Sequence, residues 1–316
     1  MTILNPTVNN LIKASNELKK GGIIAFPTET VYGLGALANN SNAIAKIFSI
    51  KKRPSFNPII AHFYSIKSVF EHAIVNKNAE ILAQKFWPGP LTMILDKTKS
   101  SKISLLASAG KKSIGVRVPA NKIAQKILRY CEYPVVAPSA NISGEISPSC
   151  ALHVYKYFDN SIRYIIDGGD CECGIESTVI DCRTQDLKIL RHGPITQEMI
   201  EKLVNVEVGN YSNISKNDIV SPGMIENHYS PKTPLRINAL TKKENEIFIS
   251  FGDTNVENPD YYLSRNADLV EAAANLFSLL HQADERNCNS IAISPIPMIG
   301  LGKAINDRIY RASKKE

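Results

Sequence analysis

Apolar residues recur along this chain at two spacings, which predict a mixture of helices and strands. Leu11, Ile12 and Leu18 follow helical spacing, so a helix is predicted over residues 7–20. Two further helices are predicted at 41–50 and 121–130. Short apolar runs predict buried strands at 23–26, 59–63, 91–95, 114–118, 135–137, 163–166, 178–182 and 187–191. Because these elements intermix without strict alternation, the fold class is α/β, with a mixed sheet flanked by helices.

The pattern changes after residue 208. Residues 209–234 are rich in Gly, Asn, Ser and Pro and poor in apolar residues, which is typical of a linker. Beyond the linker, strands are predicted at 235–238, 247–251 and 291–294, and helices at 266–283 and 303–313. The sequence therefore predicts three parts: a first domain over 1–208, a linker over 209–234, and a small α/β domain over 235–316.

Composition narrows the class of protein. The chain has 316 residues, of which 44% are apolar, enough for two domains with substantial cores. No apolar run reaches the roughly 18 residues that a membrane span needs, and the first residues lack the pattern of a signal peptide. We therefore expect a cytoplasmic protein with no membrane contact. Its six cysteines are expected to be reduced thiols, and the isolated Cys171-Glu172-Cys173 favours lone cysteines over a zinc site.

The net charge of +7 is unevenly distributed. Residues 1–195 carry 24 Lys and Arg against 14 Asp and Glu, a net +10, whereas residues 196–316 carry 13 against 16, a net −3. The first domain is therefore expected to attract anions, either nucleotide phosphates or RNA. Ordinary surface lysines that confer solubility are the alternative explanation.

Two short segments combine charge with hydrogen-bonding groups. Lys51 and Arg53 are spaced i, i+2, as are Ser139 and Asn141 about ninety residues later. The first pair supplies charge for phosphate, and the second supplies neutral donors for orientation. Pro54 prevents a helix from continuing through the cationic pair, so we expect both side chains to face a cleft, with Asn57 adding an amide contact. The alternative is a basic helix end that complements the helix dipole.

Arg117 stands between Val116 and Val118 in an apolar strand. A guanidinium there is costly unless it is paired, and its planar fork suits a carboxylate. The partner is either the carboxylate of a ligand or an internal Asp or Glu. Arg191 ends another strand and could reach a phosphate or simply be exposed.

Other polar residues near strand ends are open to a structural explanation. His62 at a strand end is usually a satisfied structural histidine, and Ser177 and Thr178 could bind a ligand or only hydrogen-bond a sheet edge.

Familiar catalytic signatures do not account for these residues. Gly33-x-Gly35 lacks the third glycine of a dinucleotide loop, and no P-loop is present. Ser139 lacks a G-x-S-x-G context, and no metal-ligand cluster is visible. Any ATP site must therefore be built without a P-loop, and neither a protein nucleophile nor a protein-bound metal is expected.

Taken in order, the motifs closely resemble the threonylcarbamoyl-AMP synthase family in its long form, which joins a YrdC-type catalytic domain to a small C-terminal domain. The resemblance implies a mixed twisted sheet followed by a small Rossmann-like α/β domain. The matching segments are residues 27–35, 51–54, 57–62, 87–92, 116–119, 138–144, 176–179, 190–193, 222–224, 228–231 and 300–308.

This resemblance implies a nucleotidyltransferase that makes threonylcarbamoyl-adenylate and pyrophosphate from L-threonine, bicarbonate and ATP, the first step of threonylcarbamoyladenosine formation in tRNA. The threonine amine takes up bicarbonate as a carbamate, whose oxygen attacks the α-phosphorus of ATP, so no protein nucleophile is required. Magnesium would accompany the ATP. A partner transferase would then deliver the threonylcarbamoyl group to tRNA.

The family pattern also implies individual roles. The threonine site would contain Thr28, Thr30, His62, Arg117 and Thr178. The ATP site would contain Lys51, Arg53, Asn57, Ser139, Asn141, Ser147, Arg191 and Tyr229, the last reaching back from a linker that folds over the site as a lid. The chain departs from the family pattern at Ile225, where a basic residue is usual, and at His192, where proline is common.

Two other functions compete with this one. A non-catalytic module that binds double-stranded RNA or tRNA would use the net +10 of the first domain, but it would need neither an arginine on a buried strand nor a lid. Carbamoyl transfer of the kind seen in hydrogenase maturation would need fused acylphosphatase and zinc-finger segments, which these 316 residues do not contain.

Overall fold

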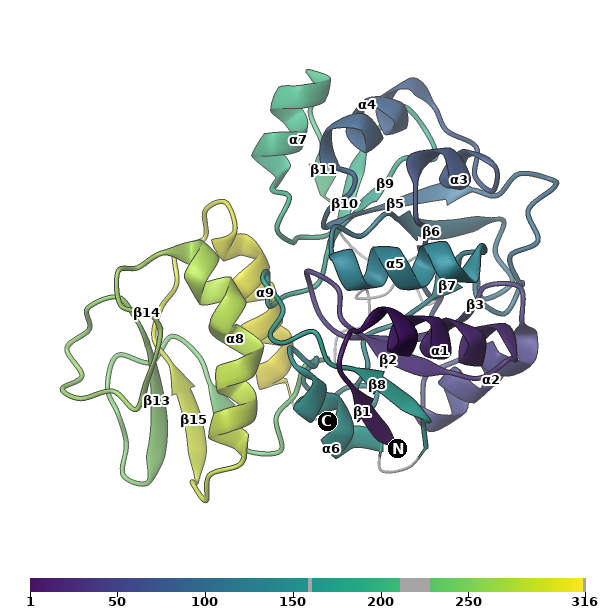
Figure 1. Cartoon of the computed structure of the whole chain (residues 1–316). Coiled ribbons are helices and arrows are strands. Elements are labelled where there is room, and N and C mark those ends of the chain that lie inside the picture. Colours follow the sequence, from purple (N-terminus) through teal and green to yellow (C-terminus); the bar gives the residue numbers. More distant parts are fainter. Residues whose placement is uncertain (159–160, 211–227, 315–316) are drawn as a thin grey trace.

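The computed structural model describes residues 1–158, 161–210 and 228–314. Two separate sheets organise the chain, and each has its own helices (Figure 1). The larger sheet has the strand order β1-β8-β2-β3-β7-β4-β6-β5-β9-β10-β11. Its strands are β1 (Thr2–Leu4), β2 (Ile24–Phe26), β3 (Gly33–Leu37), β4 (Ala61–His62), β5 (Leu91–Asp96), β6 (Ser113–Arg117), β7 (Val135–Val136), β8 (Tyr164–Ile166), β9 (Thr178–Asp181), β10 (Lys188–Arg191) and β11 (Gly209–Asn210).

This larger sheet is mixed, as the sequence predicted. For example, β4 pairs with β6 in parallel, while β5 and β6 are antiparallel. The helices that accompany it are α1 (Val8–Lys19), α2 (Ser41–Ile50), α3 (Ile66–Phe70), α4 (Lys77–Phe86), α5 (Lys122–Cys131), α6 (Ala151–Phe158) and α7 (Gln197–Val204). The sheet with helices on its faces confirms the predicted fold class.

Alternating side chains along the strands divide the core into two layers. Ile24 and Phe26 of β2 pack with α1 and α5, whereas Ala25 between them belongs to the larger cluster that includes α2 and α4. Helices α1 and α5 lie side by side in Figure 1, so they cover one face of the sheet together. Successive side chains of a strand point to opposite faces of the sheet, so apolar residues at consecutive positions are buried on both faces of this central strand.

Strand β3 (Gly33–Leu37) begins in the 31–35 segment, for which no strand was predicted. A Cβ on Gly35 would lie 2.7 Å from the Phe26 ring and 2.9 Å from Val135. Only glycine therefore lets β3 pack closely between β2 and β7. The glycines that make this approach possible also remove the apolar alternation from which a strand is recognised.

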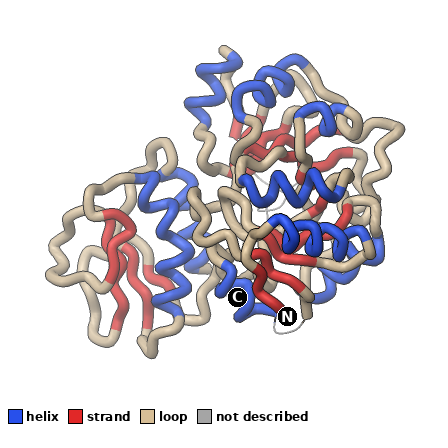
Figure 2. The backbone as a smooth tube through the Cα atoms, viewed as in Figure 1, coloured by secondary structure: helices blue, strands red, loops and turns tan. Residues whose placement is uncertain are grey.

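The smaller sheet is entirely parallel. Its order is β12-β15-β13-β14. The strands are β12 (Leu235–Arg236), β13 (Glu246–Phe251), β14 (Tyr261–Ser264) and β15 (Ser290–Ile293), and the helices are α8 (Leu269–Asp284) and α9 (Gly302–Ser313). Figure 2 shows these two helices between the two sheets. The expected small α/β unit is confirmed, with β14 as a strand that the sequence did not predict.

The two units share an apolar core. Val31, Ile146 and Ile175 of the first unit cluster with the buried face of α8. The backbones approach so closely that a Cβ on Gly174 would lie 2.2 Å from the Ala274 carbonyl oxygen. Because burial of this kind stabilises both surfaces at once, the small unit is packed onto the first and is not merely tethered to it.

Some sequence predictions fall outside the described residues. Of the linker predicted over 209–234, residues 211–227 are not described, so the 222–224 motif and Ile225 lie outside the structure. No helix in the described ranges is long and apolar enough to cross a membrane, and the cytoplasmic location stays a prediction. All six cysteines are free thiols.

A pair of stacked histidines joins the two units. The rings of His153 on α6 and His281 on α8 are 3.8 Å apart at their centroids, and both side chains are buried. His281 Nε2 lies 3.2 Å from the Ser147 carbonyl oxygen, and the Ser149 amide donates to His153 Nδ1 at 3.3 Å. Burial lowers the pKa of His153 to about 3 and that of His281 to about 4.

We predict that acid weakens this junction. Both folded-state pKa values lie below the usual 6.5, so the folded state binds fewer protons than the unfolded state and stability falls as pH drops from 6.5 towards 4. Each histidine contributes up to about 1.4 kcal/mol per pH unit. The thermal midpoint measured at pH 7.5 and 5.5 should fall less with pH in His281→Gln than in the wild type. Equal pH dependence in both would contradict the assignment.

Candidate functional site

Strand ends from distant parts of the larger sheet meet around one cavity. Thr28 follows β2, His62 ends β4, Arg117 ends β6, Ser139 follows β7 and Arg191 ends β10. The full lining is Thr28, Thr30, Val31, Gly33, Arg53, Ile60, His62, Arg117, Ala137, Pro138, Ser139, Glu176, Ser177, Arg191 and His228. Seven of the residues that the family pattern assigned to the two sites therefore share one concavity, together with Ser177.

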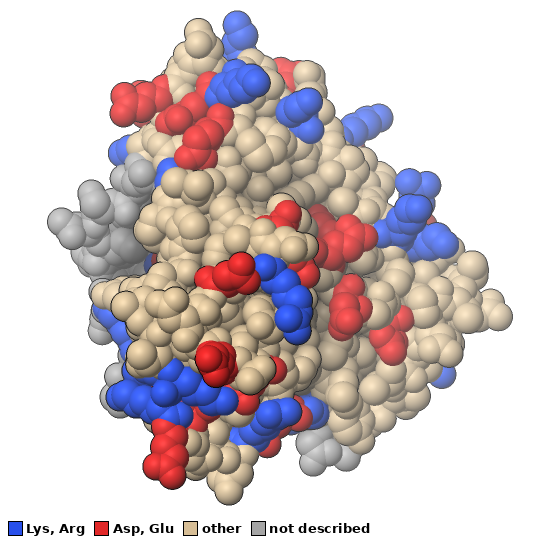
Figure 3. Space-filling view, turned by 90° about the vertical axis from the view of Figure 1, so that its left-hand side faces the viewer, with Lys and Arg blue, Asp and Glu red and all other residues tan. Residues whose placement is uncertain are grey.

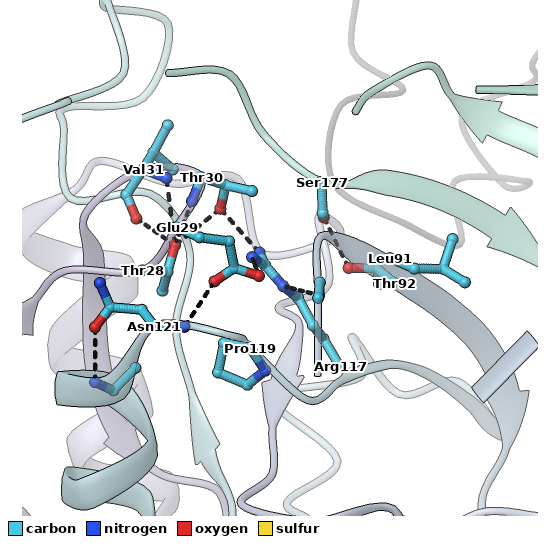
Figure 4. Close-up of polar contacts among 12 residues, drawn as sticks. Thr28, Glu29, Thr30, Val31, Leu91, Thr92, Arg117, Pro119, Asn121 and Ser177 are labelled. Atoms are coloured by element: carbon cyan, nitrogen blue, oxygen red, sulfur yellow. Dashed lines mark hydrogen bonds and ion pairs between the residues drawn. The ribbon is translucent and has the colours of Figure 1, made fainter. Parts of the chain in front are cut away.

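Arg117 is held on three sides (Figure 4). Its Nη2 lies 2.7 Å from Glu29 Oε1, its Nη1 donates to Thr30 Oγ1 at 2.9 Å, and its Nε donates to the Gly89 carbonyl at 3.3 Å. The internal carboxylate that the sequence left open is thus Glu29. A guanidinium has five N–H donors, and these contacts use three, so two are left without a partner among the described residues.

Glu29 and the two threonines fix the orientation of this arginine. Burial opposes ionisation of Glu29, but the charge and hydrogen bond of Arg117 lower its pKa below the usual value. Thr28 donates to the Val31 carbonyl at 2.7 Å, so in the 2.8 Å contact between the hydroxyls Thr30 is the donor. Each hydroxyl therefore has a defined role, and the arginine is preorganised before any ligand arrives.

His62 lies opposite Arg117, because β4 and β6 pair in parallel with these two residues in register. Burial and the charge of Arg117 lower the pKa of His62 to about 3, so the ring is neutral. Its buried Nδ1 has no hydrogen-bond partner among residues 1–158, 161–210 and 228–314. A buried polar atom without a partner beside a cavity is available to a ligand.

Arg53 and Arg191 bring positive charge to the same cavity without a directly paired carboxylate. Arg53 donates to the Asn57 carbonyl at 3.1 Å and to the Pro58 carbonyl at 2.6 Å. Arg191 donates to the Ser177 carbonyl at 2.9 Å and to its hydroxyl at 3.1 Å. Within the described part of the chain, neither makes an ion pair with a carboxylate.

These two buried guanidinium groups repel each other. Burial and the charge of Arg191 lower the pKa of Arg53 to about 9, and burial lowers that of Arg191 as well. Buried cations that are hydrogen-bonded only to neutral groups are stabilised by an anion placed between them. This part of the cavity is therefore suited to phosphate.

Lys51 corrects one expectation from the sequence. It does not face the cleft but is 1% exposed, and its Nζ donates to the carbonyls of Ser139 (2.6 Å) and Asn141. Burial and the nearby Arg53 lower the pKa of Lys51 well below its usual value. The lysine thus ties the end of α2 to the 138–141 loop, so it shapes the site from behind.

Two of the predicted amides also lie behind the cavity. The Asn57 carbonyl accepts from Arg53, and the Asn141 side chain donates to the Ile142 and Glu145 carbonyls, both at 2.8 Å. Their Oδ1 atoms are buried and have no partner in the described ranges.

Three more predicted residues are also outside the lining. Ser147 donates to Glu176 Oε1 at 2.5 Å. Thr178 Oγ1 donates to the Ile195 carbonyl at 2.6 Å and accepts from its amide, and the neighbouring Ser177 lines the cavity instead. Tyr229 stacks on Phe277 of α8 with centroids 5.3 Å apart, so it is His228 that reaches the cavity from the linker.

Sequence reasoning gave no role to Glu29, Glu176 or His228. The lone Arg117 on an apolar strand indicated that a carboxylate partner was needed, and Glu29 lies within the 27–35 motif. The sequence therefore contained a signal from which Glu29 could have been predicted. Nothing in local spacing connects Glu176 to its neighbours in space.

A resident metal has no obvious protein ligands. The described residues contain no group of three His, Cys, Asp or Glu side chains that could hold a metal ion. Glu176, the only carboxylate among the described lining residues, is already bonded to Ser147 and to Arg308.

Residues 16–193 match the protein family described as "Telomere recombination", and residues 195–314 match the family described as "Threonylcarbamoyl-AMP synthase, C-terminal domain".

Curated relatives match along nearly the whole chain. The threonylcarbamoyl-AMP synthase of Pyrococcus abyssi is 36% identical over 95% of this chain and 93% of its own length. The protein of the same name from Bacillus subtilis is 35% identical over 96% and 92%. The crystal structure of P. abyssi Sua5 complexed with L-threonine has a TM-score of 0.88 and 33% identity, covering 99% of this chain and 98% of that one.

We predict that Arg117 and Glu29 are interdependent in stability. Arg117→Ala leaves a buried, unpaired carboxylate, so it should lower the free energy of unfolding by about 3–5 kcal/mol. The double variant Glu29→Gln/Arg117→Ala removes the unpaired charge and should recover most of that loss. Denaturant unfolding of both variants measures the effect, and equal destabilisation would show that the pair is not coupled.

Proposed function

Because this chain belongs to the threonylcarbamoyl-AMP synthase family, we propose that it makes L-threonylcarbamoyladenylate from L-threonine, bicarbonate and ATP and releases pyrophosphate. The observation that carries this function is a single cavity with two kinds of cationic group. Arg117 is already oriented and neutralised by Glu29, whereas Arg53 and Arg191 are buried and make no direct ion pair within the described residues. The first kind suits one carboxylate, and the second suits several phosphate charges.

We assign the amino acid to the Arg117 side of this cavity. The two N–H groups that remain on Arg117 would bind the threonine carboxylate, since a planar guanidinium matches that group. His62 Nδ1, which is buried and has no partner among the described residues, would accept or donate one further hydrogen bond. Thr28 and Thr30 would act mainly by holding Arg117, because their hydroxyls are already engaged.

The phosphates of ATP would lie between Arg53 and Arg191. Ser139 and Ser177 line the same cavity and supply neutral hydrogen bonds. Lys51, Asn57 and Asn141 would contribute by fixing the two loops, a role that their contacts support. Ser147, Thr178 and Tyr229 would act through neighbours as well.

The chemistry then needs proximity more than a reactive side chain. The threonine amine and bicarbonate give a carbamate and water, a carbamate oxygen forms a bond to the α-phosphorus, and the bond to pyrophosphate breaks. An adenylyl group moves from ATP to the carbamate, which is nucleotidyl transfer. A carbamate is short-lived, so holding it beside its acceptor in one cavity accounts for most of the catalysis, and the arginines stabilise the departing charge.

His228, at the end of the linker, forms part of the cavity wall and so affects how a ligand enters the site. The cavity has a volume of about 50 Å³ with His228 in its wall, well below the roughly 300–1,000 Å³ of pockets that hold drug-sized ligands. We propose that His228 and Tyr229 move when ATP enters and return over it, in keeping with the expected lid.

Magnesium would arrive with ATP. Mg²⁺ usually keeps several waters and binds substrate phosphates with few protein ligands. A site with three buried arginines and a single carboxylate that is already engaged fits that mode of binding. When bound, the ion would neutralise charge on the phosphates.

The adenylate is a mixed anhydride, so a further enzyme must accept its threonylcarbamoyl group. We propose a tRNA threonylcarbamoyl transferase as that downstream partner. Direct contact with tRNA or double-stranded RNA is a separate proposal. On the face shown in Figure 3, Lys and Arg side chains are interspersed with Asp and Glu, which is unlike the basic surface that binds RNA backbones.

We predict that pyrophosphate release requires both co-substrates. With ATP and Mg²⁺ present, leaving out either L-threonine or bicarbonate should reduce release to background, because the carbamate cannot form. A coupled pyrophosphate assay measures this. Binding of tRNA with no pyrophosphate release under any condition would favour the non-catalytic RNA-binding module instead.

We also predict that the two halves of the cavity can be separated by mutation. Arg53→Met should weaken binding of a nonhydrolysable ATP analogue by about 1.5–3 kcal/mol, while L-threonine affinity stays unchanged. Calorimetry on both ligands measures the difference. Lys52→Met, which removes an exposed neighbouring charge, is the matched control and should bind both ligands normally. Loss of threonine binding in Arg53→Met would overturn the division.

A further inference from the structure

The 300–308 motif at the start of α9 ends in a residue that the proposed reaction has not used. Arg308 is the largest side chain that the described part of the chain buries completely, with 0% exposure. A guanidinium in that position is costly unless its charge is matched. The groups that surround Arg308 therefore show how its charge is matched.

Arg308 reaches across the junction to the wall of the cavity. Its Nε lies 3.0 Å from Glu176 Oε2, its Nη1 lies 2.8 Å from Asp307 Oδ2, and its guanidinium lies 5.5 Å from the centre of the Tyr229 ring. The other oxygen of Glu176 accepts the hydroxyl of Ser147. One arginine of the C-terminal unit thus contacts the linker and the first domain at the same point.

Glu176 is an unusual member of this cavity. It is the only carboxylate among the described residues that line the space in which Arg53 and Arg191 are placed for an anion. Left unpaired, its negative charge would oppose a triphosphate. Burial disfavours the charged form, yet Arg308 and Arg191 together lower the pKa of Glu176 below its usual value, so the carboxylate is ionised and balanced.

The same carboxylate anchors the phosphate side of the site. Ser177 follows Glu176 directly, and Arg191 donates to both the carbonyl and the hydroxyl of Ser177. A displacement of Glu176 would therefore be passed on to Arg191 through one peptide unit. Replacement of a buried ion pair by apolar residues is often neutral or stabilising, so stability alone does not explain why these two charges are paired.

We propose that Arg308 is a positioning residue of the adenylation site, through which the C-terminal domain neutralises and fixes Glu176 so that the nucleotide phosphates can bind. The inference rests on the proposed function, since it assumes that ATP occupies this cavity. Arg308 itself touches no reacting atom. It acts through Glu176, Ser147 and the Ser177–Arg191 contact.

The test uses the full chain and calorimetry with a nonhydrolysable ATP analogue, alongside pyrophosphate assays. Arg308→Met should raise the Kd for the analogue and the KM for ATP by about 10- to 100-fold, because an unpaired carboxylate then faces the phosphates. The KM for L-threonine should change by less than about threefold, since Arg117 keeps its own partner. Adding Glu176→Gln to this variant should restore ATP affinity to near the wild-type value.

Two controls separate this role from simple docking of the domains. Lys303 lies on the same helix as Arg308 and makes another ion pair between the units, with Glu198 at 2.7 Å. Lys303→Met removes this ion pair and should leave the KM for ATP unchanged. Thermal midpoints of all variants report their stability. If Arg308→Met fails to fold, Arg308→Lys, which keeps the charge, is assayed in its place.

Three outcomes would overturn the inference. These are a normal KM for ATP in folded Arg308→Met, no recovery on adding Glu176→Gln, or an equal loss in Lys303→Met. If the wild-type chain itself fails to bind the ATP analogue, the proposed function falls and this inference falls with it. Wild-type binding together with a normal Arg308→Met variant rejects the inference alone.

Discussion

Three buried guanidinium groups around one cavity set the main constraint on this structure. Arg53, Arg117 and Arg191 come from separate segments of the larger sheet, and each is nearly removed from water. Such groups are tolerated only when hydrogen bonds and counter-charges are arranged for them. Arg117 receives Glu29, whereas the other two donate to neutral oxygens and make no direct ion pair within the described residues. The fold stabilises the first internally and leaves the other two placed for an anionic ligand.

Many features of the fold follow from positioning these groups. The parallel pairing of β4 with β6 sets His62 opposite Arg117, and Gly35 lets β3 approach β2 and β7 closely enough for the strand ends to converge. Lys51 fixes the 138–141 loop from behind. The C-terminal unit adds to this framework because its α8 and α9 pack against the first domain and place one further charge beside the cavity.

Sequence reasoning predicted the parts of this arrangement that depend on local patterns. The helices near residues 8–19, 41–50 and 122–131 and the strand that carries Arg117 were recognisable from periodicity. The same reasoning failed for Lys51, because no pattern shows that two carbonyls ninety residues away converge on its ammonium group. It also gave no role to Glu176 and Arg308, whose contact joins residues 132 positions apart. Contacts between distant segments depend on the assembled sheet, which a single sequence does not reveal.

The central claim is that one cavity seats a carboxylate on Arg117 and phosphates between Arg53 and Arg191. A crystal structure of the full chain with L-threonine and a nonhydrolysable ATP analogue tests it most directly. The account predicts both ligands in the same cavity, with the threonine carboxylate within about 3 Å of the Arg117 guanidinium and phosphate oxygens at Arg53 and Arg191. Ligands bound on separate surfaces, or phosphates that bypass both arginines, would contradict it.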